Sequence, residues 1–256
     1  MTEPLLHSDR RGAGPLAVLL HPVGLDGTFW GALPDRLART HTVVAIDMPG
    51  HGRSGPAARP GRMDACVAAV AAVIEAERAG PAVVIGLSFG GMVAQNLALA
   101  RPDLVAALIP SGCGGRIPET ARPAILARGT DAETGGMAAV VEGTIERWFT
   151  PGFRATAAAE AVRRRLLADD PSGWSAAWEA ISGHDALDRL GAVQMPALVI
   201  GGEADAATPV EAARALAAAI PGAELAILPG APHMMQIESP DLYAAAIEGF
   251  LARRGL

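Results

Sequence analysis

The sequence contains no lysine, so its 21 positive charges are all arginines, and these are scattered along the chain. With 27 acidic residues the formal net charge is −6, and no basic stripe is present. We therefore expect no nucleic-acid partner. No apolar run approaches the ~20 residues that cross a membrane, and residues 1–11 lack the apolar segment of a secretory signal. We expect no membrane partner and a cytoplasmic location.

Cysteine and aromatic residues are also scarce. Cys66 and Cys113 stand alone, without CxxC spacing or a histidine cluster, so the sequence indicates neither a zinc site nor a disulfide framework. Aromatic residues make up only 4% of the chain, so the core must be built from Ala, Val, Leu and Ile. A chain of 256 residues, half of them apolar, predicts one domain or one domain with an insertion. We expect no metal and no cofactor, and the oligomeric state stays open.

The most informative stretch is a short apolar run followed by a helical pattern. Residues 82–85 predict a strand buried on both faces, and residues 92–100 predict a helix. Between them, residues 86–90 form a G-x-S-x-G motif, in which the serine occupies a sharp and strained turn. Side chains larger than glycine on either side would collide there. The motif predicts that Ser88 is a nucleophile, and the alternative is a glycine-rich turn with an idle serine.

Predicted strands and helices alternate along the chain, which favours a mainly parallel central sheet with helices on both faces, an α/β fold. The other strands are expected at 5–8, 16–20, 42–46, 104–109, 197–201 and 224–228, and the first helix at 29–39. The interval between the strands at 104–109 and 197–201 is far longer than one crossover needs. We predict a core formed by residues 1–115 and 191–256, with residues 116–190 as an inserted helical cap. The cap would cover the carboxyl ends of the strands, where α/β folds bind ligands.

A serine hydroxyl needs a base to act as a nucleophile, usually a histidine oriented by a carboxylate. Among the six histidines, His233 follows the last predicted strand, at the edge of the sheet where Ser88 is expected. It is the predicted base. Asp205 follows the strand at 197–201 and is the predicted acid. Glu203, two residues nearer that strand, is the alternative.

Attack by the serine creates an oxyanion, which backbone N–H groups can stabilise. Phe89, the residue after the nucleophile, is expected to supply one donor. Val23 is expected to supply the other, because its neighbour Pro22 has no N–H. The predicted substrate pocket is apolar and consists of Trp30, Trp148, Trp174, Trp178 and Met234. The alternative role for the tryptophans of the cap is to anchor it to the core.

These motifs resemble the α/β-hydrolase superfamily over nearly the whole chain. The segments that match are 21–24 (HPVG), 47–54 (DMPGHGRS), 86–91 (GLSFGG), 202–205 (GEAD) and His233. Residues 146–153 (ERWFTPGF) and 173–190 resemble the 3-oxoadipate enol-lactonase branch, although the residues near Trp174 and the loop at His21 depart from its pattern. The resemblance implies the α/β-hydrolase fold, a Ser88–His233–Asp205 triad and the opening of a small lactone.

The sequence therefore predicts a cofactor-independent serine hydrolase that opens a small lactone or cleaves a carboxylic ester through an acyl-enzyme. Two alternatives remain. The same triad serves haloperoxidase-like perhydrolysis, carbon–carbon bond hydrolysis and steps of natural-product assembly in related folds. The second alternative is a ligand-binding protein that uses the pocket without turnover.

Overall fold

A seven-stranded sheet forms the centre of the computed structural model, which describes residues 6–256. The strands are β1 (Ser8–Gly12), β2 (Leu16–Leu20), β3 (Thr42–Ile46), β4 (Ala82–Leu87), β5 (Val105–Ser111), β6 (Leu198–Gly202) and β7 (Glu224–Leu228). Their order in the sheet is β1-β3-β2-β4-β5-β6-β7. β1 pairs antiparallel with β3, and the other neighbours are parallel. The prediction of a mainly parallel sheet is confirmed.

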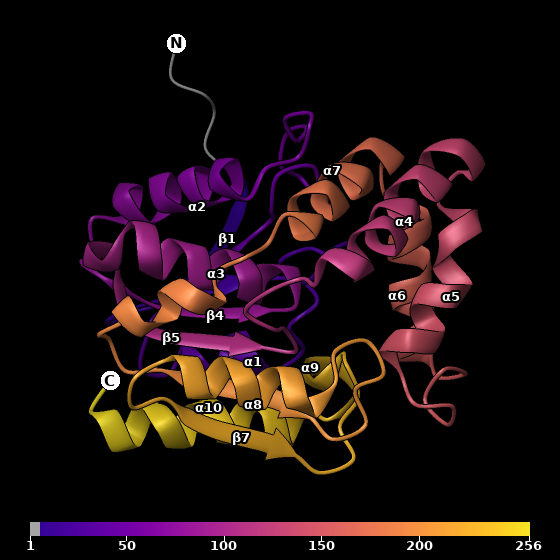
Figure 1. The fold of residues 1–256 in the computed structure, drawn as a ribbon. Helices are drawn as coiled ribbons and strands as arrows, with labels where there is room; N and C mark the ends of the chain where they lie inside the picture. The colour runs from indigo at the N-terminus through magenta and orange to yellow at the C-terminus, as the bar shows by residue number, and fades with distance from the viewer. Residues whose placement is uncertain (1–5) are drawn as a thin grey trace.

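Helices follow the strands in the order that the alternating pattern predicts. Outside the long interval between β5 and β6 they are α1 (Leu33–Leu37), α2 (Met63–Glu77), α3 (Phe89–Ala100), α8 (Val210–Ala219), α9 (Met235–Glu238) and α10 (Pro240–Arg254). Short 3₁₀ turns occur at Pro102–Leu104, Glu119–Ala121 and Leu187–Ala192. α3 packs against β2, β4 and β5, and α2 packs on α3. α1 packs on α10 (Figure 1). Both faces of the sheet are therefore covered.

The central strands β2, β3 and β4 are buried along their whole length. Parallel strands covered by helices on both faces have no solvent-facing side, so both sets of side chains must be apolar. The continuous runs of Ala, Val, Leu and Ile in these strands meet that requirement. β7, at the edge of the sheet, is only partly buried.

Several element boundaries differ from those expected. The edge strand begins at Ser8 instead of residue 5, because the chain as far as Gly12 pairs with β3, and Leu5 lies outside the described residues. The helix expected at 29–39 is limited to α1, and Gly31 in the preceding turn has a φ of 56°. β5 continues beyond residue 109 as far as Ser111, which still pairs with the end of β4.

Between β5 and β6 the chain forms four α-helices, called here the helical insertion. They are α4 (Arg122–Gly135), α5 (Ala138–Trp148), α6 (Ala157–Leu167) and α7 (Pro171–Ser182). Local sequence starts two of them, since Thr156 accepts a hydrogen bond from the Ala159 N–H and Asp170 accepts one from the Ser172 N–H. The arrowheads of β5 and β7 point to the side of the molecule where α4, α5 and α6 lie (Figure 1). The insertion therefore stands near the carboxyl ends of the strands.

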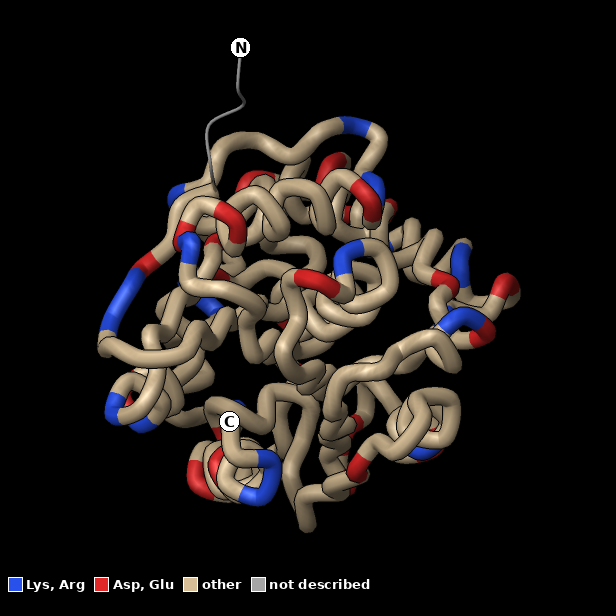
Figure 2. Tube along the Cα trace, turned by 90° about the vertical axis from the view of Figure 1, so that its left-hand side faces the viewer, with Lys and Arg blue, Asp and Glu red and all other residues tan. Residues whose placement is uncertain are grey.

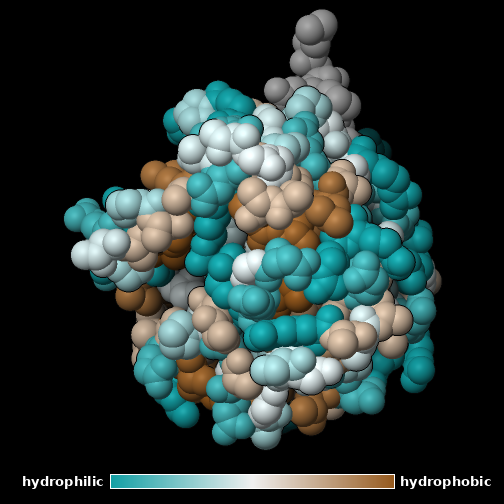
Figure 3. Space-filling view, turned by 90° about the vertical axis from the view of Figure 1, so that its right-hand side faces the viewer, coloured by the Kyte–Doolittle hydropathy of each residue, from teal (hydrophilic) through white to brown (hydrophobic). Residues whose placement is uncertain are grey.

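The insertion turns its apolar side inward. α5 buries residues at helical spacing, among them Val141, Ile145 and Trp148. On the face that carries the insertion, hydrophobic side chains form separate patches among hydrophilic ones (Figure 3). On the opposite side, acidic and basic residues are interspersed (Figure 2). Among residues 6–256, no helix is both long and apolar enough to cross a membrane.

Candidate active site

The turn that carries Ser88 joins β4 directly to α3. Ser88 has a φ of 54° and a ψ of −114°, a backbone conformation that is strained for a residue with a Cβ. A Cβ on Gly86 would lie 2.3 Å from the carbonyl oxygen of Gly90, and one on Gly90 would lie 1.9 Å from that of Leu20. The structure thus confirms the sharp turn and the need for both glycines.

Asp205 and His233 are hydrogen-bonded to each other after β6 and β7. The Nδ1 of His233 lies 2.8 Å from Oδ2 of Asp205, and their side chains are 3% and 0% exposed. The other carboxylate oxygen, Oδ1, accepts hydrogen bonds from the N–H groups of Ala207 and Thr208, each at 2.8 Å. A carboxylate can only accept, so Nδ1 carries the proton and Nε2 is the basic nitrogen of the ring.

The end of β5 connects Ser88 to this pair. The N–H of Ser88 donates to the carbonyl oxygen of Ser111 at 2.8 Å. The next residue, Gly112, has a φ of 55°, and a Cβ there would lie 3.5 Å from Nδ1 and Cε1 of His233. The hydroxyl of Thr208, in the Asp205 loop, donates to the Gly112 carbonyl at 3.1 Å. Two consecutive residues, Ser111 and Gly112, therefore contact the serine turn, the histidine ring and the aspartate loop.

The sequence patterns did not single out Gly112. A glycine immediately after a buried strand was the available signal, but that pattern is common in turns. Ser111 was missed as well. Its hydroxyl lies 3.1 Å from that of Tyr243, which ties the end of β5 to α10.

The two predicted oxyanion donors lie on neighbouring segments. Phe89 is the first residue of α3, and the N–H groups of a first helical turn have no partner within the helix. Val23 lies three residues after the end of β2, whose Leu20 pairs with Gly86 and touches the serine turn. Both side chains are buried. The fold thus brings the loop after β2 against the start of α3.

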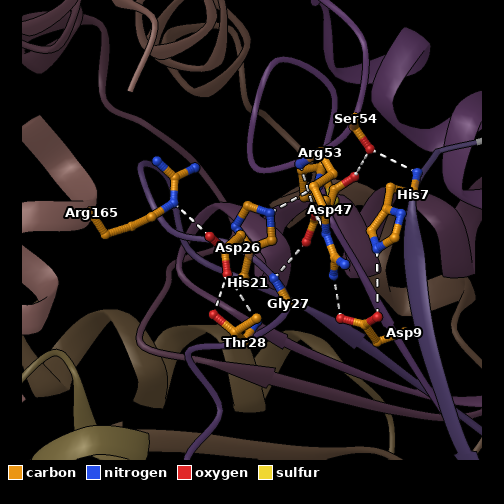
Figure 4. A network of polar contacts seen from close by, with 11 residues as sticks. His7, Asp9, His21, Asp26, Gly27, Thr28, Asp47, Arg53, Ser54 and Arg165 are labelled. Atoms are coloured by element: carbon orange, nitrogen blue, oxygen red, sulfur yellow. Dashed lines mark hydrogen bonds and ion pairs between the residues drawn. The ribbon is translucent and has the colours of Figure 1, made fainter. Parts of the chain in front are cut away.

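The loop after β2 is held by polar side chains, among them His21 and Asp47 from the segments that carry the family resemblance (Figure 4). His21 is fully buried, its Nδ1 donates to the Pro22 carbonyl at 2.7 Å, and its Nε2 accepts from the Met48 N–H at 2.8 Å. Burial lowers the pKa of His21 to about 4, so the ring is neutral at pH 7. Asp47, after β3, accepts a hydrogen bond from the Gly27 N–H at 2.8 Å.

The predicted pocket residues fall into three groups. Trp148 lies beside His233, with ring centroids 6.3 Å apart, and its carbonyl accepts a hydrogen bond from the buried Met234. Trp174 and Trp178 pack edge to face at 5.5 Å within the insertion. Trp30 stacks on Tyr243 of α10 instead, at 6.5 Å. Trp148 and Met234 are thus the members of this set in contact with the catalytic histidine candidate or next to it in the chain.

Among residues 6–256, no group of three or more His, Cys, Asp or Glu side chains is arranged to hold a metal ion. Cys113 is buried near the end of β5, where it accepts a hydrogen bond from Gln95, and burial raises the pKa of its thiol to about 12. A thiol held protonated in this way is a poor nucleophile. Cys113 is therefore poorly suited to covalent catalysis.

Comparison with known proteins gives a consistent result. A model described as "Alpha/beta hydrolase family" matches residues 17–246. Polyketide synthase ThaQ of Burkholderia thailandensis is 32% identical over 250 residues, which are 94% of this chain but only 12% of the synthase. A pimeloyl-[acyl-carrier protein] methyl ester esterase of Chromobacterium violaceum is 35% identical over 231 residues, 87% of this chain and 88% of the esterase. The crystal structure of the enol-lactonase from Burkholderia xenovorans LB400 aligns with a TM-score of 0.92, 27% identity and coverage of 96% of both chains.

Proposed function

The chain belongs to the α/β-hydrolase family, and from this premise we propose that it is a serine hydrolase acting on a small carboxylic ester or lactone. The observation that supports the proposal is the buried hydrogen bond between Asp205 and His233. Ser111 and Gly112 link this pair to the turn that carries Ser88. A nucleophile, a base and an orienting acid are the minimum set for acyl transfer through a covalent intermediate.

In the proposed mechanism, Nε2 of His233 removes the hydroxyl proton of Ser88 as its Oγ attacks the substrate carbonyl. Asp205 holds the ring through Nδ1–H and stabilises the imidazolium that forms. The N–H groups of Val23 and Phe89 donate to the oxyanion, each contributing about 3 kcal/mol in the transition state. His233 then returns the proton to the leaving oxygen, and a water molecule activated by the same ring hydrolyses the acyl-enzyme.

We further propose that residues 116–190 act as a cap over this site. The support is the position of the helical insertion near the carboxyl ends of the strands and the contact of Trp148 with His233. With His233 only 2% exposed, a substrate would be enclosed between the core and the insertion. An enclosed site is shielded from bulk water, which strengthens the electrostatic interactions within it.

Two arginines of the insertion support an anionic substrate. The guanidinium of Arg128 lies 4.6 Å from the centre of the Trp178 ring, and Arg147 precedes Trp148. Both are partly buried, and neither pairs with a carboxylate within 4.0 Å among residues 6–256. Burial lowers the pKa of both, and the charge of Arg147 further lowers that of Arg128. A carboxylate on the acyl group would relieve this repulsion.

The test compares wild type with Ser88→Ala on p-nitrophenyl esters and five-membered lactones, each in neutral and carboxylate-bearing forms. We expect the variant to lose roughly 10⁵-fold or more in kcat, as removal of a catalytic serine does in other serine hydrolases. Circular dichroism should show an unchanged fold. A variant that retains activity would reject Ser88 as the nucleophile, and equal rates on neutral and anionic esters would reject the anionic substrate.

The alternatives are distinguished by assaying the wild type on further classes of substrate. A wild type that is inactive on esters and lactones but forms a peracid from a carboxylic acid and hydrogen peroxide, or cleaves carbon–carbon bonds, would keep the triad and change the reaction. A wild type that binds such compounds without turnover would favour the ligand-binding role.

A further inference from the structure

A largely buried ion-pair cluster joins the helical insertion to the loop after β2. Nε of Arg165, on α6, lies 2.5 Å from Oδ2 of Asp26, and NH1 lies 2.7 Å from Oδ1 of Asp169. The three side chains are only 15%, 13% and 2% exposed. Figure 4 shows Arg165 directed at Asp26 from outside the loop. Arg165 thus pairs with Asp169 within the insertion and with Asp26 of the core.

Asp26 stabilises the turn that directly follows the one containing Val23. Its Oδ1 accepts hydrogen bonds from the N–H and the hydroxyl of Thr28, at 2.9 and 2.6 Å. The backbone around it forms two successive turns, from Leu25 to Pro22 and from Phe29 to Asp26. Asp26 therefore belongs to a short, hydrogen-bonded loop. Val23 lies three residues before it in the same loop, so a change at the Asp26 carboxylate is expected to shift Val23.

The insertion also presses on this loop through apolar contacts. Gly24, next to Val23, has a φ of 76°, and a Cβ there would lie 2.5 Å from the Leu166 side chain and 2.6 Å from that of Trp174. Leu166 directly follows Arg165. The packing therefore sets how near α6 and α7 approach the loop, and the ion pair between Arg165 and Asp26 lies beside this contact.

The neighbouring Arg163 shows what an ordinary ion pair on this helix is like. It pairs with Glu142 and Glu160, whose side chains are 66% and 49% exposed. Solvated pairs of this kind contribute little to stability. Removing Arg165 instead would leave the carboxylate of Asp26 buried without its partner, which is costly, so the loop would move to solvate it.

We propose that Arg165 is a positioning residue for the oxyanion hole: through Asp26 it fixes the loop so that the Val23 N–H is aimed at the oxyanion. This inference rests on the proposed hydrolase function. A backbone donor stabilises the transition state only when it lies about 2.7–3.1 Å from the oxyanion, and a displacement of about 1 Å can cost roughly 100-fold in rate. Arg165 thus takes part in catalysis without touching the reacting atoms.

The experiment compares Arg165→Gln, Arg165→Lys and the matched control Arg163→Gln with wild type. For Arg165→Gln we expect kcat to fall about 10- to 100-fold, with KM within about twofold of wild type, because the lost interaction acts in the transition state. Affinity for a boronic acid, which forms a tetrahedral adduct on the serine, should fall in parallel. Arg165→Lys should restore part of kcat, and Arg163→Gln should match wild type.

Hydrogen exchange of the peptide that covers residues 21–29 gives a readout independent of activity. It should be faster in Arg165→Gln and unchanged in Arg163→Gln. If Arg165→Gln fails to fold, Asp26→Asn tests the same contact, because its amide oxygen can still accept from Thr28 while the charge is lost. For either variant, unchanged kcat in an active, folded enzyme would overturn the proposal.

The two possible failures are distinguishable. An inactive wild type, or an active Ser88→Ala variant, would reject the proposed function and with it the catalytic part of this inference. Unchanged exchange in the 21–29 peptide would show that Arg165 does not hold the loop, whatever reaction the protein performs.

Discussion

Buried histidines of this protein differ in what their ring nitrogens contact. His21 and His184 bond to backbone groups and to an asparagine amide, and burial lowers the pKa of each to about 4. They are neutral at pH 7, and their hydrogen bonds connect neighbouring segments of the fold. His233 bonds to the carboxylate of Asp205, a partner that stabilises the imidazolium when the ring accepts a proton. The partner, more than burial, is what suits His233 to proton transfer.

The substitution Asp205→Asn tests the role of the carboxylate by replacing one of its oxygen atoms with an amide nitrogen. An asparagine amide that donates to Nδ1 would place the ring proton on Nε2, where the ring can no longer act as a base. We expect Asp205→Asn to lower kcat about 10⁴-fold with little change in fold, as measured by ester or lactone hydrolysis and circular dichroism.

Glu203→Gln is the matched control for that substitution. Its Oε2 accepts a hydrogen bond from the Gly230 N–H at an exposed position, and we expect activity within about twofold of wild type. A large loss in Glu203→Gln together with a mild one in Asp205→Asn would reverse the assignment of the acid.

The positions of Ser88, Asp205 and His233 could be predicted because each follows a strand, and the carboxyl ends of parallel strands share one edge of a sheet. The contact between Asp26 and Arg165 could not, since these residues lie 139 positions apart and neither stands in a motif. The same holds for Trp30. Its apolar side chain suited a pocket or a core equally well, and only the packing places it against Tyr243.

At the scale of elements, α7 is packed unusually close to its neighbours. A Cβ on Gly173, in its first turn, would lie 2.2 Å from the carbonyl oxygen of Gly50, in the loop after β3. A Cβ on Gly61 would lie 1.7 Å from the carbonyl oxygen of Ala176. On the other side, Gly129 of α4 lies against Ser175. Glycines therefore allow backbone to approach backbone on two sides of this helix.

Gly173→Ala should destabilise the protein although alanine is the better helix former. The gain in helix propensity is about 1 kcal/mol, but the methyl group would collide with backbone that has no flexible end to move away, and overpacking costs about 1–3 kcal/mol. We expect a lower urea midpoint and an altered KM, because α7 would shift relative to the loops after β2 and β3.

Gly152→Ala, also in the insertion, is the control. A Cβ there would meet nothing within 4 Å, so stability and KM should equal those of wild type. A midpoint for Gly173→Ala at or above that of wild type would show that α7 can move away from Gly50 without cost.

For the whole molecule, the α/β architecture was predictable because the apolar runs, their lengths and their spacing all favour the same alternation of strands and helices. The order of strands was not, since no local pattern states that β2 lies between β3 and β4. The helical character of the insertion could also be predicted from the sequence. Their docking on the core depends on contacts such as that between Gly24 and Leu166, which only the folded chain reveals.

Proton binding by buried groups makes the stability of the whole molecule depend on pH. Burial lowers the pKa of His21 to about 4, of His51 to about 3 and of His184 to about 4, whereas an unfolded chain titrates its histidines near ~6.5. Asp169 acts in the opposite sense, because burial raises its pKa to about 7 against the effect of Arg165. Between pH 4 and 6.5 these three histidines are therefore protonated in the unfolded state but not in the native state. Over the same range Asp169 is protonated in the native state but not in the unfolded state.

Because the histidines outnumber the single aspartate, the free energy of unfolding should fall as the pH is lowered from 7 to 5, at about 1.4 kcal/mol per pH unit for each net proton. Urea unfolding at pH 5, 6 and 7 measures this as a midpoint that is lowest at pH 5. Asp169→Asn removes the opposing group, so its midpoint should depend more steeply on pH than that of wild type. Equal midpoints at pH 5 and 7 in both proteins would mean that the buried histidines accept protons without unfolding, and that the framework around the active site tolerates charge at its centre.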